Sequence, residues 1–274
     1  MGILNVTPDS FSDGGRFDAV DAAVEHARTM VSEGATIIDI GGESTRPGAA
    51  PVSVSTELAR VVPVVEAVAE LGVTISIDTR RAEVARRAVD AGAGIINDVS
   101  ASLWQTAADL GVGWVAMHMA GEPATMQDDP AYVDVVAEVF SDLVECGERA
   151  RAAGVSEVWI DPGFGFGKTA RHNLELVAAI DEFVASPFPV VLGASRKRTL
   201  GLMTTYADLF IDPPVDVDEL DQVEASEVDD RVEAALAVAV WAMRAGVQVL
   251  RVHDVASHVA AARVVFGVEW DDAA

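Results

Sequence analysis

Polar side chains follow a series of short apolar runs, and their types suit the binding of a flat, donor-rich molecule. Asp78, Asn97 and Asp161 each close such a run. A carboxylate can accept two parallel N–H bonds from a guanidine-like edge, and an amide can both donate and accept. If these three side chains meet, they predict a site for a nitrogen heterocycle.

A second set of polar residues has the chemistry of phosphate binding. Lys197 follows the seventh apolar run, and Arg251 and His253 follow the eighth. Asn5 follows the first run, and its neutral oxygen suits Mg²⁺, which takes few protein ligands and completes its shell with water and phosphate oxygens. No Ser-His-Asp or Cys-His arrangement is evident, so a covalent intermediate is not expected. The residues together predict a heterocycle that carries a phosphate or diphosphate.

Eight apolar runs must position these side chains. They are rich in Val and Ile and do not alternate, which is typical of parallel strands covered on both faces. The runs are Gly2–Leu4, Thr36–Ile40, Val73–Ile77, Gly94–Ile96, Gly113–Met117, Glu157–Ile160, Pro189–Leu192 and Val247–Leu250. Segments with helical spacing lie between or after them, among them Asp18–Gly34, Arg80–Gly92, Glu224–Gly246 and Asp254–Phe266. This alternation predicts an α/β fold with a parallel sheet.

The number of strand–helix units selects the architecture. Eight units in 274 residues predict a single-domain (β/α)8 TIM barrel over residues 1–274, with the active site at the C-terminal mouth of the barrel. A doubly wound open sheet is the rival, but no GxGxxG motif follows the first run. The one interruption is the acidic segment 203–230, for which we expect a solvated, partly helical surface loop and not a second domain.

Composition excludes several classes of protein. With 50% hydrophobic residues the chain is not a disordered one, and its apolar runs are too short for a membrane span. A net charge of −25 argues against nucleic-acid binding. The single cysteine, Cys146, and the lack of a signal sequence lead us to expect the cytoplasm. Many acids and only two lysines suggest a halophilic protein, although a GC-rich genome would also replace Lys by Arg.

Eight motifs, in order, resemble those of the dihydropteroate synthase family. They are MGILNVTPDSFSDGG at 1–15, GGESTRPG at 41–48, SIDT at 76–79, IINDVS at 95–100, MHMAGEPATMQDDPAY at 117–132, DPGFGFGKTARHN at 161–173, LGASRKRTLG at 192–201 and RVHDV at 251–255. The resemblance covers nearly the whole chain, apart from 203–230. It implies a transferase of folate biosynthesis that condenses a dihydropterin methyl diphosphate with 4-aminobenzoate, releasing diphosphate.

The resemblance also implies roles for individual residues. Pterin contacts are expected at Asp78, Asn97, Met117 or Met119, Asp161 and Lys197. Diphosphate contacts are expected at Arg251 and His253, with Mg²⁺ as cofactor at Asn5. The aminobenzoate pocket, where sulfonamides compete in this family, is expected at Thr45, Arg46, Phe166 and Ser195. Of these, Asp78, Lys197, Arg251 and His253 are the expected catalytic residues. Loops Val6–Phe17 and Glu43–Ala50 are expected to close over the substrates, and the protein is expected to be a homodimer.

Two alternative functions remain open. One is a catalytically inactive pterin-binding paralog. The other is a methyltetrahydrofolate-dependent methyltransferase, an enzyme whose fold is similar to the one expected here. The family usually has several residues before the first strand, so we expect either a trimmed start or a part of a longer or fused protein.

Several of the polar residues also have structural interpretations. Asp78 could be a helix N-cap, and Asp98 is the more natural cap beside Asn97. His118 is either a core histidine or a site residue. Lys168 is expected to position its loop or to lie near the diphosphate, and His26 and His258 are expected at the surface.

Overall fold

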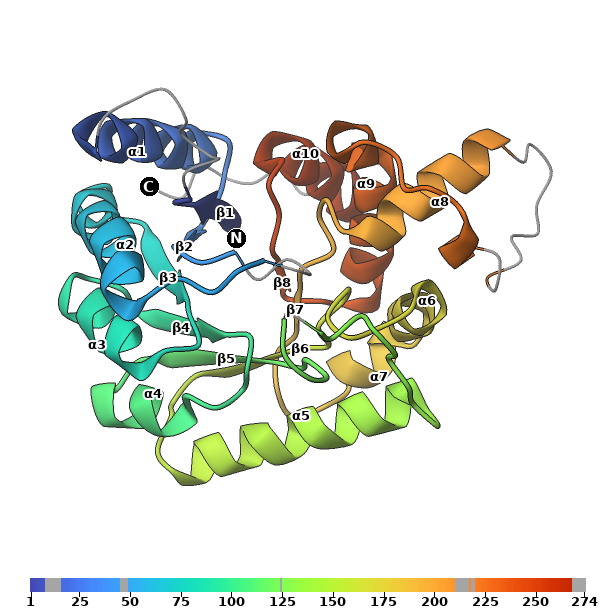
Figure 1. The fold of residues 1–274 in the computed structure, drawn as a ribbon, viewed down its shortest axis with the longest axis horizontal. Coiled ribbons are helices and arrows are strands. Elements are labelled where there is room, and N and C mark those ends of the chain that lie inside the picture. Colours follow the sequence, from blue (N-terminus) through green and yellow to red (C-terminus); the bar gives the residue numbers. More distant parts are fainter. Residues whose placement is uncertain (8–15, 45–48, 124, 210–216, 218–219, 268–274) are drawn as a thin grey trace.

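The computed structural model describes residues 1–7, 16–44, 49–123, 125–209, 217 and 220–267. Among these residues, parallel strands form a ring with helices around it (Figure 1). The strands are β1 Gly2–Asn5, β2 Ile37–Gly41, β3 Thr74–Asp78, β4 Ile95–Asp98, β5 Gly113–Met117, β6 Val158–Asp161, β7 Val191–Leu192 and β8 Val249–Leu250. The helices are α1 Arg16–Ser32, α2 Val54–Ala69, α3 Ala82–Asp90, α4 Trp104–Leu110, α5 Val135–Ala152, α6 Ala170–Ala178, α7 Ile180–Val184, α8 Arg198–Leu209, α9 Val232–Ala245 and α10 Val255–Phe266. Each predicted strand is therefore present, displaced by two residues at most.

The ring closes in sequence order. Strands β1 to β6 pair side by side in one parallel sheet, and β7 pairs with β8. A parallel bridge between Ile160 and Val190 connects β6 with the start of β7, and a second bridge joins Gly2 to Val252 just after β8. Ile3 N–H donates to Val252 O at 2.9 Å across this last junction. The predicted (β/α)8 barrel is confirmed, with every strand end on the same side.

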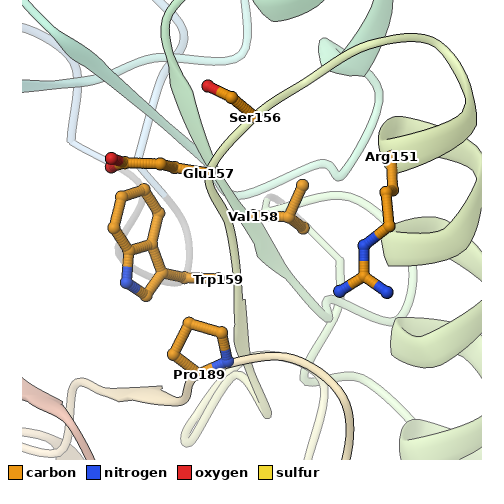
Figure 2. A pocket seen from close by; sticks show the side chains of 6 residues that line it. All are labelled: Arg151, Ser156, Glu157, Val158, Trp159 and Pro189. Carbon is orange, nitrogen blue, oxygen red and sulfur yellow. The ribbon is translucent and has the colours of Figure 1, made fainter.

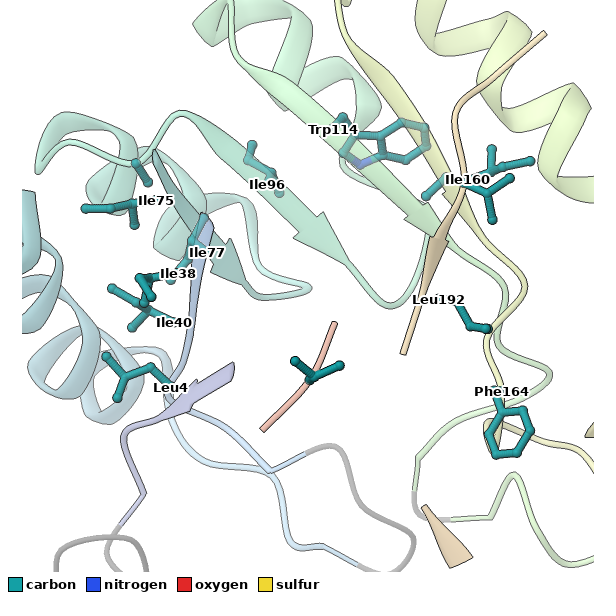
Figure 3. Close-up of a cluster of buried hydrophobic side chains, with 14 of the residues drawn as sticks. Leu4, Ile38, Ile40, Ile75, Ile77, Ile96, Trp114, Ile160, Phe164 and Leu192 are labelled. Atoms are coloured by element: carbon teal, nitrogen blue, oxygen red, sulfur yellow. The ribbon is translucent and has the colours of Figure 1, made fainter. Parts of the chain in front are cut away.

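Alternation along each strand separates two environments. Ile38, Ile40, Ile75 and Ile77 point outward and pack against the helices, as Figure 3 shows for this part of the core. The residues between them point into the barrel. An apolar interior layer consists of Ile37, Ile95, Val115, Trp159, Val191 and Val249. The strand sequences lack a polar–apolar alternation in their lower parts because both faces are covered there.

The helices differ from the predicted ranges mainly at their starts. The N-cap position of α3 is Arg81, so Asp78 does not cap that helix. α9 begins at Val232 and not at 224, because residues Val228–Arg231 form a separate 3-10 turn. No helix in the described ranges is both long and apolar enough to cross a membrane.

The described part of segment 203–230 is partly helical, as expected, but it is not all solvated. α8 continues to Leu209. A short 3-10 helix follows at Leu220–Gln222, and the side chain of Leu220 has no exposed surface. Leu220 packs with Leu202, Tyr206 and Ala170. A few apolar side chains among the acids are enough to attach the segment to α6 and α8. Residues 210–216 and 218–219 lie outside the described ranges.

Candidate active site

Most of the residues predicted for the site form a layer directly above the apolar interior of the barrel, together with Asp39, which was not predicted. They are the next inward-facing positions along the strands: Asn5 on β1, Asp39 on β2, Asp78 on β3, Asn97 on β4, Met117 on β5, Asp161 on β6 and Arg251 after β8. Parallel strands in a barrel all end at one mouth, so the closure described above brings these side chains to one level.

An arginine between two carboxylates occupies one side of this layer. Arg251 Nε donates to Asp39 Oδ2 at 2.6 Å, and its Nη2 donates to Asp78 Oδ2 at 2.6 Å. Asn97 Nδ2 donates to the same Asp39 oxygen at 3.0 Å. Burial opposes the charge of Arg251, but the two carboxylates outweigh it and raise its pKa. The group is a connected network and not three separate ligands.

Asp39 is the site residue that the sequence analysis missed. Its side chain is completely buried, in the middle of a strand that the sequence shows as an apolar run. A carboxylate within the run Thr36–Ile40 is itself a signal, because an acid is rarely buried without a charged partner. The partner, Arg251, could not be identified from local sequence.

Burial changes the proton affinity of Asp78. It raises the pKa of that carboxyl to about 7, although Arg251 acts in the opposite direction. Asp161 is also buried, which raises its pKa, while a hydrogen bond of 2.8 Å from Gly163 N–H to Oδ1 favours its charged form. Both acids at the mouth therefore have proton affinities above those of surface carboxylates.

Lys197 lies between Asp161 and the glycine-rich loop after β6. Its Nζ donates to Phe164 O at 2.9 Å and lies 3.6 Å from the centre of the Phe166 ring. Burial lowers the pKa of Lys197 to about 7, with Asp161 opposing the shift. A cation over an aromatic face in a partly desolvated site is a favourable contact. Phe166 also packs with Met117 and Met126, so the ring forms a wall of the site.

Ser195 and His253 meet at the mouth, a contact that the sequence analysis did not predict. Ser195 Oγ lies 3.0 Å from His253 Nδ1 and accepts from His253 N–H at 3.2 Å. The hydroxyl thus joins the loops after β7 and β8. Arg196 between Ser195 and Lys197 has φ of 61°, and its guanidinium pairs with Asp254 at 3.0 Å. Such a strained residue needs the surrounding contacts to hold it.

The remaining polar residues separate into structural and peripheral positions. Asp98 organises the loop before α4, because its carboxylate accepts from Ser102 N–H and Leu103 N–H at 2.7 and 2.6 Å. Lys168 is buried and bonded to its own loop, in agreement with a positioning role. His258 is wrongly placed at the surface by the sequence analysis: it is 5% exposed, and its Nδ1 lies 2.7 Å from Asp254 O.

The glycine-rich loop tolerates no side chain at Gly163. Its φ is 69°, and a Cβ there would lie 1.8 Å from His118 O. We expect Gly163→Ala to lower the free energy of unfolding by about 3 kcal/mol, because the loop must move away from residue 118. Thermal unfolding measures the effect. Gly111→Ala is the matched control, since Gly111 has φ of 67° with nothing within 4 Å and should cost about 1 kcal/mol.

Asn5 is the one predicted metal ligand, and it fits a weakly held magnesium ion. It ends β1 beside Gly41 and is half-buried at the mouth. Within the described ranges no group of three or more His, Cys, Asp and Glu side chains could hold a metal. A single amide oxygen is consistent with Mg²⁺ that shares its shell with water and substrate phosphate, and not with a metal caged by protein.

Thr45 and Arg46 lie outside the described residues, as do the centres of the two loops expected to close over the site. The ends of the second loop are anchored, because Arg81 Nη2 donates to Glu43 Oε1 at 3.1 Å and to Val52 O at 2.7 Å.

A hollow of about 230 Å³ lies at the opposite end of the barrel and is not the candidate active site (Figure 2). It is lined by Arg151, Ser156, Glu157, Val158, Trp159 and Pro189. Arg151 is already engaged, since it donates to Pro187 O at 3.0 Å and covers the Phe188 ring at 4.3 Å. In TIM barrels this face serves stability.

Comparison with known proteins identifies the family of this chain. The family of pterin binding enzymes matches residues 1–253. Dihydropteroate synthase of Mycobacterium leprae is 46% identical over 273 residues, covering 97% of this chain and 91% of that protein. Xanthomonas albilineans dihydropteroate synthase solved with 4-aminobenzoic acid has a TM-score of 0.85 at 44% identity, covering 99% and 93% of the two chains. Its complex with 7,8-dihydropteroate has a TM-score of 0.82 at 40% identity, with the same coverage. The resemblance in the motifs is confirmed, and the chain belongs to the pterin-binding enzyme family, among the dihydropteroate synthases.

Proposed function

We propose that this protein condenses (7,8-dihydropterin-6-yl)methyl diphosphate with 4-aminobenzoate to give 7,8-dihydropteroate and diphosphate. The observation that carries the proposal is the set of Asp78, Asn97, Asp161 and Lys197 on one level of the barrel mouth. Two acids and an amide offer acceptors to the N–H groups of a pterin, and the lysine offers a donor. The dihydropteroate synthases described above support the assignment.

The proposed chemistry is a dissociative, SN1-like displacement. Departure of diphosphate leaves positive charge on the pterin methylene, which the Asp78 carboxylate stabilises. Arg251 and His253 stabilise the negative charge on the leaving group. Because Nε and Nη2 of Arg251 already bind Asp39 and Asp78, we propose that diphosphate meets its Nη1. The arylamine is a nucleophile without further activation, so the residues act by orientation and electrostatics.

The aminobenzoate is proposed to bind between the Phe166 ring and Ser195, with Thr45 and Arg46 completing the pocket. Phe166 supports this because its ring lies against Lys197, which joins the pterin and aminobenzoate sides of the site. Magnesium, when bound with the diphosphate, would supply positive charge opposite the leaving group at Asn5. The residues themselves bind and orient the substrates.

Three further properties are proposed on indirect support. Exposed apolar side chains on α9 and α10, with Trp241 56% and Phe266 52% exposed, support a homodimer. An acidic chain whose two lysines both lie in the site region supports a halophilic protein. The single cysteine supports a cytoplasmic location. Sedimentation in low and molar KCl tests the first two together, since a salt-adapted dimer would dissociate at low salt.

The direct test is diphosphate release by the purified protein with the pterin diphosphate, Mg²⁺ and 4-aminobenzoate. Release that requires both substrates, and a product with the mass of 7,8-dihydropteroate, would establish the reaction. The assay should be run from low salt to molar KCl. Pterin binding without turnover at any salt would instead identify an inactive pterin-binding paralog.

We expect the acidic limb of the pH profile to depend on Asp78. With a pKa raised to about 7, this carboxyl gains a proton as the pH falls below that value and then accepts only poorly from the pterin N–H groups. The kcat/KM for the pterin diphosphate should therefore decline about tenfold per pH unit below that pKa. In Asp78→Asn the remaining activity should lose this limb. A limb that persists unchanged in Asp78→Asn would assign it to another group.

A further inference from the structure

Lys168 is a buried amine that contacts the backbone of the glycine-rich loop after β6. Its side chain is 3% exposed, although lysine is among the residues least often buried. Nζ donates to Phe166 O at 3.1 Å and to His118 O at 3.4 Å, and lies 2.9 Å from His118 Nδ1. An ammonium has three N–H donors, and here each has one acceptor. Lys168 therefore fastens the loop after β6 to the end of β5.

The imidazole of His118 completes this arrangement as an acceptor. Burial and the neighbouring Lys168 lower the pKa of His118 to about 3, so the ring is neutral. With Nδ1 accepting from Lys168, the ring proton is on Nε2, which lies 3.7 Å from Asp142 Oδ2. Tyr132 packs beside the ring at 6.2 Å between centroids. The histidine is thus a largely buried residue whose ring accepts a hydrogen bond from Lys168.

The loop fastened by Lys168 carries the aromatic wall of the candidate site. Three glycines with positive φ, Gly163, Gly165 and Gly167, give it little side-chain packing of its own. Phe164 O and the Phe166 ring are nevertheless held against Lys197, at 2.9 and 3.6 Å. A cation–π contact weakens once the ring leaves its place beneath the cation. The position of the Phe166 ring therefore depends on the contacts that hold its backbone, such as the bond from Lys168 to Phe166 O.

We propose that Lys168 is a positioning residue that holds the Phe166 ring against Lys197 and so sets the affinity for the aromatic amine substrate. The proposal rests on the proposed function, because it concerns the aminobenzoate side of that site. An apolar side chain of similar length would avoid the cost of burying an amine. It would leave Phe166 O and His118 O without this donor, and the glycine-rich backbone could then relax away from Lys197.

The test compares Lys168→Met with the wild-type enzyme in two measurements. The KM for 4-aminobenzoate should rise about tenfold, while the KM for the pterin diphosphate changes less than about threefold. Without any substrate, amide hydrogen exchange of residues 163–167 should become about tenfold faster, because the loop loses its anchor. A purely structural role would lower the melting temperature but would not separate the two KM values.

Tyr132→Phe is the matched control, because Tyr132 also bonds the loop after β6. It removes the bond of 3.0 Å from Tyr132 Oη to Gly167 O but leaves the Phe166 contact with Lys168 intact. Both of its KM values should stay within about twofold of wild type. If Lys168→Met does not fold, His118→Phe removes one of the three acceptors and should raise the aminobenzoate KM about threefold.

Each result decides the proposal. Equal rises in both KM values, an unchanged aminobenzoate KM, or unchanged exchange in the variant that lacks Lys168 would overturn it. If the wild type releases no diphosphate, the proposed function fails by itself. Amide exchange and calorimetric binding of 4-aminobenzoate to the two proteins then decide the positioning role: faster exchange with weaker binding supports it, and any other combination overturns it.

Discussion

Arg251→Met is expected to lower the free energy of unfolding by about 3 kcal/mol, because it leaves two buried carboxylates without their cation. Arg251 now bonds Asp39 and Asp78, and the Asp39 side chain is completely buried. Asp39 Oδ1 already has no hydrogen-bond partner among the described residues, so the network has no spare donor to compensate. Urea unfolding at neutral pH measures the loss.

The loss should depend on pH in a defined direction. Asp78 has a folded pKa of about 7 against an ordinary value of 3.8, so the folded protein binds more protons than the unfolded chain between these values. Stability attributable to this group therefore falls as pH rises from about 4 to about 7. Without Arg251 the pKa of Asp78 should rise further, and the variant should recover part of its stability at pH 5.

Two variants separate the lost ion pairs from a general effect of removing an arginine. Adding Asp39→Asn to Arg251→Met should restore part of the stability, since one uncompensated charge is removed. Arg86→Met removes a surface pair with Asp109, 3.5 Å apart and about half exposed, and should change stability by less than about 1 kcal/mol. Equal destabilisation by the Arg251 and Arg86 variants would contradict the network.

Asp161→Asn is expected to reduce kcat/KM for the pterin diphosphate by about 10²- to 10³-fold. The carboxylate is 4% exposed and lies at the end of β6, where Gly163 N–H fixes one of its oxygens. An amide in this place offers one acceptor where the carboxylate offers two, and its NH₂ group opposes the N–H groups of the pterin. Steady-state kinetics with saturating 4-aminobenzoate measures the effect.

The matched control is Asp90→Asn, the same change of charge on an exposed residue that ends α3. Its kcat/KM should stay within about twofold of wild type. Melting curves of both variants check that Asp161→Asn is folded, because an amide oxygen accepts more weakly than a carboxylate from Gly163 N–H. A folded Asp161→Asn protein with nearly normal kinetics would remove Asp161 from the pterin site.

Local sequence was sufficient for the elements and for most of the strand-end residues. Apolar runs of Val and Ile identify the strands because both faces of a parallel barrel strand are covered. Asp78, Asn97 and Asp161 are visible because each ends such a run. The same logic overlooked Asp39, since a run is recognised by its average character, and it placed His258 at the surface although Asp254 O binds it.

The sequence by itself thus determined the strand order, the barrel and the chemical types gathered at its mouth. Only the tertiary structure decided the pairings among them. Arg251 meets Asp39 and Asp78 across 212 and 173 residues of chain, and Lys168 meets His118 across 50. Propensity and periodicity report on neighbours within a few turns of chain. Contacts over these distances arise when β8 closes on β1 and the loops of successive units pack together, so they depend on the complete barrel.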